Sequence, residues 1–448
     1  MKQIFLITTI LVAGLMAGGQ ARLVSKPVNY EAASWPTWLL DDPQKIVVAA
    51  PPGKAESKAE LQSLKQRITA IDQNKIEQIR YWNAGAPAYR WNHIASRMVD
   101  QKPELMLRIP TAWVNLAVYD ATVLAWRVKL KYRRARPGMV DPSLRSLIDV
   151  PLTYSYPCEH TVTAAAAATM LAYFFPEKKD SIMKLAHAAS QSRLDAGVQF
   201  PSDIEAGWKL GEEVAKQIIE KAKNDGSSKV WNGTMNKDPK KWTGSYPMGI
   251  ALASFTPLVM RSVDQFRPDA PPDFESDMKD LRAMKQNFKT ASLAYYWANN
   301  GGFDYWSELA GQKMFEYRMQ DDAPAAARIY AVLHIAYHDA AIAIFDAKYT
   351  YWGIRPVQYD STFKPLISTP PFPGYPSGHA TGAATTAAVM EYFFPADAEQ
   401  FHKLAQDCAD SRFYAGIHFR VDNETGLKMG KEIGKYIAET FIEGGKQH

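Results

Sequence analysis

The sequence predicts an all-α protein built from two tandem, related helical bundles. Three observations support this fold class. From Glu60 onward, apolar residues recur at spacings of three and four, as in the run LKQRITAIDQNKIEQIRYW. Alternating β-branched runs bounded by Asn-Gly or Asp-Gly are scarce. A set of residues also recurs in the second half of the chain at a constant offset.

The repeat has an offset of 219 residues, from 129 to 348. Lys129, six residues and Arg136-Pro137 in the first half match Lys348, six residues and Arg355-Pro356 in the second. The same offset relates further pairs: Asp120 and Asp339, His160 and His379, Phe174-Phe175-Pro176 and Phe393-Phe394-Pro395, Ser192-Arg193 and Ser411-Arg412, Asp203 and Asp422, Gly211 and Gly430. Trp82 and Trp91 match Trp297 and Trp306 at an offset of 215. A shared register of this length indicates a tandem duplication.

The chain divides by composition into five segments. Residues 1–21 have the form of a secretory signal peptide, with Lys2, an apolar run from Ile4 and small residues ending at Ala21. We therefore expect an exported protein, periplasmic or secreted, and the alternative is an uncleaved anchor. Residues 22–59 are a Pro-rich extended lead-in, 60–226 a degenerate helical bundle, 227–290 a connecting segment and 291–448 the catalytic bundle.

The connecting segment, residues 227–290, is rich in Pro, Gly and aromatic residues. A long connection in a helical protein is either a functional lid or a plain linker, and its apolar content argues against a solvated tether.

Composition excludes some classes of function. The net charge of +5 over 448 residues is mild, and no Lys/Arg tract with interleaved aromatic residues suggests nucleic-acid binding. After the signal peptide, no clean apolar run reaches about 18 residues, so we expect no membrane span in the mature protein. The two cysteines, Cys158 and Cys408, fall in different copies, which favours two free thiols. The sequence does not indicate an oligomeric state.

Three permanent cations in the second copy predict a site for a tetrahedral oxyanion. Arg355 and Arg412 suit bidentate contacts, and Lys348 adds a point charge. Ser377 and Gly378 precede an Ala-rich predicted helix, whose first N–H groups would point at an anion.

Two histidines and a carboxylate complete the candidate site. His418 and Asp422 are four residues apart, so on a helix they share one face, and Asp422 can fix the imidazole tautomer. This makes His418 the candidate nucleophile and His379 the candidate general acid.

The first copy departs from this pattern at chemically important positions. Cys158-Glu159 replaces Ser377-Gly378, and Gln199 replaces His418. Because Gln cannot act as a nucleophile, we expect the first copy to keep the scaffold without the chemistry. Its retained basic residues could hold an anion, although a structural role is favoured.

The motifs Lys-x6-Arg-Pro, Pro-Ser-Gly-His and Ser-Arg-x5-His-x3-Asp occur in this order, with Pro356, Pro376 and Ser411 completing them. This signature resembles that of the superfamily joining type 2 phosphatidic acid phosphatases, bacterial acid phosphatases and vanadium-dependent haloperoxidases. The resemblance implies that the Lys, both Arg, Ser and Gly bind phosphate or vanadate oxygens. It also implies that His418 is phosphorylated or bonded to vanadium, that His379 is the acid–base and that Asp422 orients His418.

The resemblance leaves the branch open. The main expectation is a metal-independent phosphatase acting on phosphoric monoesters, including phospholipid phosphates, with a phosphohistidine and no cofactor. The alternative is a vanadate-bound haloperoxidase that oxidises halide with hydrogen peroxide. The doubled bundle and the run FPGYPSGHATGAA resemble haloperoxidases, and Phe372 stands where fungal chloroperoxidases carry a phenylalanine. A third possibility is a non-catalytic phosphate or polyphosphate binder.

His334 and His338 lie four residues apart on a predicted helix. A metal pair is one interpretation, but no third ligand is evident, and we favour packing or pocket lining for His338. Asp339 recurs as Asp120 in the first copy, which indicates a structural role.

Overall fold

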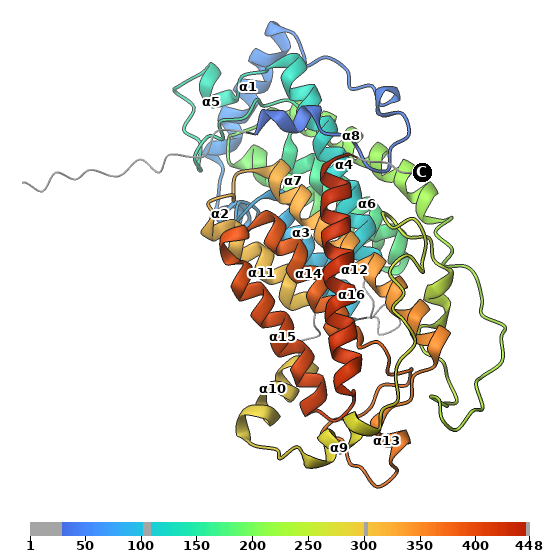
Figure 1. Ribbon diagram of the computed structural model, residues 1–448. Coiled ribbons are helices and arrows are strands. Elements are labelled where there is room, and N and C mark those ends of the chain that lie inside the picture. The colour runs from blue at the N-terminus through green and yellow to red at the C-terminus, as the bar shows by residue number, and fades with distance from the viewer. Residues whose placement is uncertain (1–28, 102–108, 300–302, 445–448) are drawn as a thin grey trace, which may run out of the picture.

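The computed structural model describes residues 29–101, 109–299 and 303–444 (Figure 1). The predicted signal peptide lies outside these residues. Within them every regular element is a helix, and no strand occurs. The all-α prediction is confirmed.

The first half of the chain contains eight α-helices after a 3-10 turn. These are η1 (Tyr30–Ser34), α1 (Lys54–Thr69), α2 (Gln73–Trp82), α3 (Pro87–Asp100), α4 (Ile109–Tyr132), α5 (Pro137–Val140), α6 (Glu159–Phe174), α7 (Lys179–Asp195) and α8 (Pro201–Ala222).

The second half repeats these elements in the same order. They are η5 (Ile250–Ser254), α9 (Glu275–Ala283), α10 (Phe288–Asn299), α11 (Phe303–Glu316), α12 (Ala323–Tyr351), α13 (Pro356–Tyr359), α14 (Gly378–Phe393), α15 (Ala398–Tyr414) and α16 (Arg420–Ile442). The tandem duplication predicted from the sequence is therefore present in the fold.

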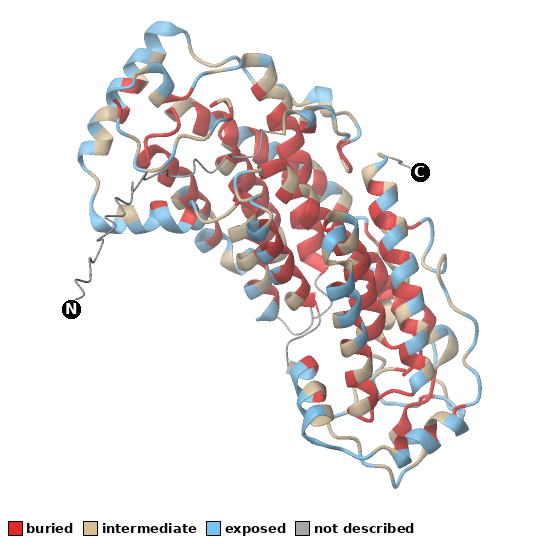
Figure 2. Ribbon diagram, turned by 60° about the vertical axis from the view of Figure 1, so that its left-hand side comes forward, coloured by how far each residue is buried: buried red, intermediate tan, exposed pale blue. Residues whose placement is uncertain are grey.

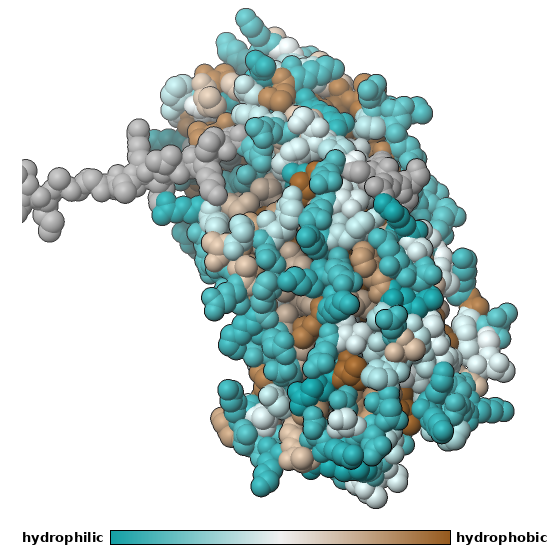
Figure 3. All heavy atoms as spheres, viewed as in Figure 1, coloured by the Kyte–Doolittle hydropathy of each residue, from teal (hydrophilic) through white to brown (hydrophobic). Residues whose placement is uncertain are grey.

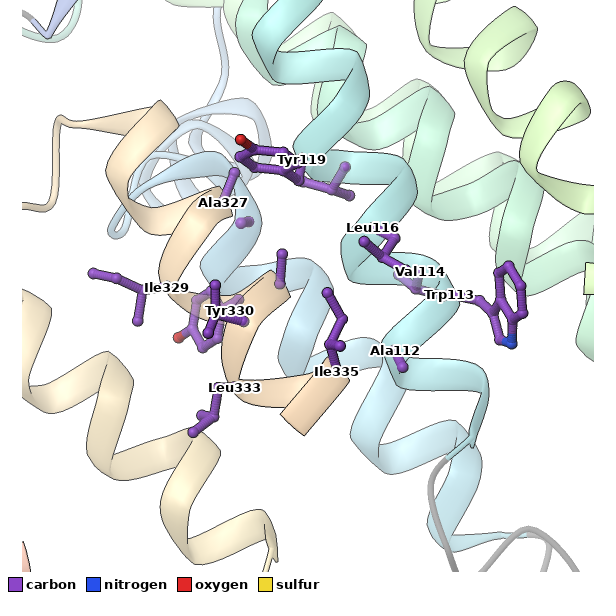
Figure 4. Close-up of a cluster of buried hydrophobic side chains, with 14 of the residues drawn as sticks. Ala112, Trp113, Val114, Leu116, Tyr119, Ala327, Ile329, Tyr330, Leu333 and Ile335 are labelled. Atoms are coloured by element: carbon purple, nitrogen blue, oxygen red, sulfur yellow. The ribbon is translucent and has the colours of Figure 1, made fainter. Parts of the chain in front are cut away.

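The two halves share one hydrophobic core, centred on α4 and α12. Both helices are apolar on nearly all sides, which is the pattern of a helix buried all round. Leu116 and Tyr119 of α4 share this core with Ala327 and Ile335 of α12, and Tyr119 lies beside Ala327 (Figure 4). Buried residues run continuously through both halves (Figure 2), while hydrophilic side chains cover most of the face seen in Figure 3. Residues Ala323–Tyr359 are long and apolar enough to cross a membrane, but 94% of that apolar window is buried within the protein.

Glycines bring the helices beside the candidate site close together. Gly430 of α16 lies against the backbone of α14, where a Cβ would overlap the carbonyl oxygen of Thr381. Gly211 of α8 lies in the same way against Val162 of α6. Both pairs follow the repeat, so the duplicated frame is kept by backbone contact as well as by side chains.

The segment 227–290 contains η5 and α9, which occupy the places that η1 and α1 take in the first half. Asp339 of α12 accepts hydrogen bonds from the backbone N–H groups of Leu258, Val259 and Met260, at 2.8 to 2.9 Å. In the first half, Asp120 accepts three such bonds from Trp38, Leu39 and Leu40. Asp339 therefore has the structural role that its recurrence predicts.

Candidate functional site

The predicted site residues converge at one end of the second half. Lys348 lies in the last turn of α12, Arg355 directly precedes α13, and Ser377 caps the start of α14. Arg412 lies in the last turn of α15, and Asp422 in the first turn of α16. Ser377 N–H donates to the carbonyl oxygen of Asp422 at 2.9 Å, which joins the start of α14 to that of α16. The corresponding site of the first half lies near α5, at the opposite end of the molecule from α13 (Figure 1).

Lys348 holds the loop that precedes α14. Its Nζ donates to the carbonyl oxygens of Pro373, Gly374 and Pro376, each at 2.7 Å. An ammonium group has three N–H donors, so all three are used on this loop. Burial and the nearby Arg355 lower the pKa of Lys348 well below its ordinary value. In this structure Lys348 therefore shapes the loop, and the direct contact with an oxyanion that the resemblance implies stays a prediction.

Arg355 is buried and has one nitrogen without a partner. Nε donates to the carbonyl oxygen of Phe372 at 3.0 Å, and Nη1 donates to that of Ile417 at 2.7 Å. Among the described residues, Nη2 is buried and contacts no acceptor. Burial lowers the pKa of Arg355 to about 10, so the guanidinium is charged at neutral pH. A buried donor of this kind costs about 1–3 kcal/mol unless it is satisfied, and an oxyanion would satisfy it.

His418 lies between Arg355 and Asp422, and these partners fix its tautomer. Arg355 Nη1 is 2.9 Å from Nε2, and Asp422 Oδ2 is 2.9 Å from Nδ1. Because a guanidinium can only donate, Nε2 accepts, and the ring proton is on Nδ1, from which it is donated to Asp422. The Nε2 lone pair therefore points toward Arg355 and accepts its hydrogen bond, which a ligand or an electrophile at Nε2 would have to displace.

Burial determines the protonation of this pair. Burial, followed by the positive charges of Arg355 and Lys348, lowers the pKa of His418 well below its ordinary value. Burial raises the pKa of Asp422 to about 7, although the same two cations oppose this shift. Asp422 also accepts a hydrogen bond from Phe419 N–H at 3.1 Å, so it caps α16 while it orients the histidine.

His379 is the second residue of α14 and is partly exposed. Burial, then Arg412, Arg355 and Lys348, lower its pKa to about 3, while a hydrogen bond with the backbone of Trp297 opposes this shift. The ring is therefore neutral at neutral pH in the free protein. A bound dianion would raise its pKa and favour the protonated form that a general acid needs.

Arg412 and the turn at Ser377-Gly378 complete the site. Arg412 Nε donates to Ser411 Oγ at 2.9 Å, and Nη2 donates to the carbonyl oxygen of Ala294 at 3.0 Å. A Cβ built on Gly378 would meet its nearest neighbours, Ile344 and Lys348, only at 3.7 and 3.9 Å. Packing therefore does not require glycine here, and its small size leaves room beside the cations for a ligand.

The structure places the two residues predicted to line the pocket in different regions. The Phe372 ring lies 5.3 Å from Lys348 Nζ and 5.2 Å from the guanidinium carbon of Arg355. His338 is buried within α12, bonded to Asp339 at 2.9 Å, and is ten residues before Lys348. Ten residues of helix span about 15 Å, so His338 lies about that far along α12 from Lys348, and its role in lining the pocket stays a prediction. The described residues contain no group of three His, Cys, Asp or Glu that could hold a metal ion.

Helix α10 contributes to the site through its backbone, which sequence reasoning missed. The Ala294 carbonyl orients Arg412, and the Trp297 backbone contacts His379. The Ile417 and Phe372 carbonyls orient Arg355 in the same way. Any residue type can supply such backbone groups, so the sequence gives no sign of these contacts. The recurrence of Trp82 as Trp297 was the one feature that drew attention to this helix.

Two family models match the chain. The PAP2 superfamily model matches residues 111–222, which lie in the first half, and the model of the VCPO second helical-bundle domain matches residues 398–443. The chain is also 34% identical over 94 residues to a non-specific acid phosphatase of Providencia stuartii. That match covers 20% of this chain and 38% of the length of the phosphatase.

The second model spans the third motif, from Ser411 to Asp422, and the first model spans the corresponding positions of the first half. Both family models are consistent with the PAP2/haloperoxidase superfamily.

Solved structures show a similar fold over most of the chain. A bacterial vanadium-dependent iodoperoxidase has a TM-score of 0.58 and 20% identity, over 87% of this chain and 98% of that protein. The apo form of a bacterial vanadium-dependent chloroperoxidase has a TM-score of 0.58 and 14% identity, over 75% of this chain and 93% of that protein. At these identities the likeness shows the fold, with both helical bundles included.

Proposed function

We propose that the protein is an exported phosphatase that hydrolyses phosphoric monoesters through a phosphohistidine at His418. The observation that carries this proposal is that the unprotonated His418 Nε2 is bonded to the guanidinium of Arg355, whose other terminal nitrogen, Nη2, has no acceptor among the described residues. An incoming phosphoryl group would displace the bond between Nη1 and Nε2. A phosphoryl oxygen bonded to Nη2 would bring its phosphorus near Nε2. The acid phosphatase that matches part of the chain supports the same class of reaction.

The first step transfers the phosphoryl group. Nε2 of His418 attacks phosphorus, and the bond from phosphorus to the ester oxygen breaks. His379, protonated once the dianion raises its pKa, donates its proton to the departing oxygen. Asp422 stabilises the positive charge that develops on the His418 ring, because it accepts the Nδ1 proton in a charge-assisted bond.

The second step releases inorganic phosphate. A water molecule attacks phosphorus, gives a proton to the now neutral His379, and the bond from phosphorus to Nε2 breaks. Arg355 and Arg412 stabilise the charge on the phosphoryl oxygens throughout, and because their side chains are buried this charge is weakly screened. Imidazole supplies the nucleophile and arginine the charge, so the reaction requires no metal ion.

The phosphatase is tested with His418→Ala, and Gln199→Ala is the matched control at the corresponding position of the first half. Turnover of p-nitrophenyl phosphate should be lost in His418→Ala and kept in Gln199→Ala. A ³²P-labelled substrate should leave an acid-labile label on the wild-type chain and none on His418→Ala. Undiminished turnover in His418→Ala would exclude the phosphohistidine.

A vanadium-dependent haloperoxidase is the second candidate, favoured by the fold likeness over 98% of the iodoperoxidase. The residues fit vanadate as they fit phosphate, because both are tetrahedral oxyanions. His418 Nε2 would hold vanadium, while Arg355 and Arg412 would hold its oxygens and His379 would move a proton at its ring nitrogen. When bound, vanadate supplies the activation of hydrogen peroxide for halide oxidation.

One side-by-side assay separates the two candidates. The protein is incubated with p-nitrophenyl phosphate, and in parallel with vanadate, hydrogen peroxide and bromide or iodide in the presence of a halogenation dye. Phosphate release without dye halogenation supports the phosphatase. Dye halogenation that depends on vanadate, without phosphate release, supports the haloperoxidase.

A further inference from the structure

The first half preserves the cations of an oxyanion site around a carboxylate of its own. Lys129 and Arg136 are buried as completely as Lys348 and Arg355. Glu159 stands at the position of Gly378, as the first residue of α6.

Glu159 makes the contacts that an oxyanion would make. Its Oε1 accepts from Arg136 Nη2 at 2.7 Å, and its Oε2 accepts from Lys129 Nζ at 2.8 Å. The corresponding nitrogen of the second half, Arg355 Nη2, has no acceptor among the described residues. Arg136 Nη2 also donates to Thr153 Oγ1, where the second half has Phe372, so the two halves differ at this atom by a carboxylate and a hydroxyl. Burial would raise the pKa of Glu159, but Arg136 and Lys129 hold it well below its ordinary value, so the group is charged.

Two further polar side chains of this site, Arg193 and Gln199, also have hydrogen-bond partners within the chain. Arg193 Nη1 donates to Asn83 Oδ1 at 2.9 Å, whereas Ala298 stands at the corresponding position beside Arg412. Gln199, in the place of the nucleophilic histidine, donates to Asp203 at 2.8 Å in the amide orientation that satisfies both of its ends. The first half thus keeps the cations that would bind an anion, Lys129 and Arg136, and has Gln199 in place of a nucleophile. The carboxylate of Glu159 is the anion that these cations bind.

We propose that the first half is an oxyanion-binding site whose ligand is the carboxylate of Glu159, and that removing this side chain opens it to tetrahedral oxyanions such as inorganic phosphate. Glycine at this position reproduces the second half, where a Cβ on Gly378 would be in ordinary contact with Lys348 at 3.9 Å and no longer side chain fills the space beyond it. Without a carboxylate, the buried Lys129 and Arg136 have no counter-charge, so an anion from solution should bind and stabilise the fold.

The test is isothermal titration calorimetry of the full chain with inorganic phosphate. Glu159→Gly should bind one more phosphate per chain than the wild type. Glu159→Gln is the control, because its amide fills the same space and should add no site. Adding Arg136→Met to Glu159→Gly should remove the extra phosphate. The result is the number of phosphate ions bound per chain beyond the number bound by the wild type. Any phosphate bound at the His418 site is the same in every variant, so it does not affect this difference.

A second measurement covers the case in which Glu159→Gly is poorly folded. Its melting temperature should rise with phosphate concentration by more than that of the wild type or of Glu159→Gln. The proposal is overturned if folded Glu159→Gly binds no additional phosphate. It is equally overturned if phosphate fails to restore an unfolded Glu159→Gly, or if Glu159→Gln gains the same extra site.

Discussion

Replacing Arg355 by lysine tests the role of the unpartnered guanidinium nitrogen. Lysine keeps the positive charge but loses the planar fork, so it cannot bond the Phe372 and Ile417 carbonyls and also present a donor beside His418. The Nη2 bond to a charged oxygen is the interaction that this change removes.

The expected loss follows from the energy of that bond. A hydrogen bond to a charged group contributes about 1.5–3 kcal/mol, and each 1.36 kcal/mol changes a rate or binding constant about tenfold. We therefore expect Arg355→Lys to lower kcat/KM for p-nitrophenyl phosphate by about 10- to 150-fold. Its affinity for inorganic phosphate, measured as a competitive inhibitor, should fall by a similar factor.

The first half provides a matched control for this substitution. Arg136→Lys changes the same position of the repeat, where Glu159 and not a substrate is the partner of Nη2. This variant should keep kcat/KM within about twofold of the wild type when rates are expressed per folded chain. Equal losses in the two variants would refute the reasoning, as would an Arg355→Lys enzyme with wild-type kcat/KM.

Three further predictions concern the carboxylate, the general acid and the helix contact. Asp422→Asn should lower kcat by about 10- to 100-fold without a large change in melting temperature, because it keeps the Phe419 hydrogen bond acceptor and loses the charge; an unchanged kcat would contradict this. The pKa of His379 is about 3 in the folded protein and 6.5 in an ordinary environment. Between these two pH values the unfolded chain binds a proton that the folded protein does not, so the free energy of unfolding decreases as pH falls below 6.5. Urea unfolding should show about 2 kcal/mol less acid destabilisation between pH 7 and 5 in His379→Asn than in the wild type, and equal losses would contradict the assignment. Gly430→Ala should cost about 1–3 kcal/mol in the same assay, because its Cβ would overlap the backbone of α14, and an unchanged midpoint would contradict that contact.

The fold was predictable because its signals are periodic and repeated. Helical spacing from Glu60 and the offset between the two halves predict the all-α duplication that the structure shows. The correspondence between η1 and η5 was not predicted from the sequence. The segments that follow them, at Trp38 and Leu258, are held through backbone N–H groups by Asp120 and Asp339, and only the two aspartates repeat visibly in the sequence.

The sequence predicts which residues come together at the candidate site, but it does not predict all of their contacts. Residue types and spacing bring Arg355, His379 and His418 together, since the ends of α12, α14, α15 and α16 meet. They do not show that Lys348 uses its three donors on loop carbonyls, because those acceptors belong to the backbone. His338 was predicted from its residue type alone; it lies about 15 Å along α12 from Lys348 and bonds Asp339, so its place in the pocket stays a prediction.

A crystal structure of the protein with orthovanadate tests the central claim most directly. The account predicts vanadium within bonding distance of His418 Nε2, with one vanadate oxygen accepting a hydrogen bond from Arg355 Nη2 and none bound in the first half beside Glu159. Vanadate bound elsewhere, or a His418 Nε2 that stays bonded to Arg355 while vanadate occupies another site, would contradict it.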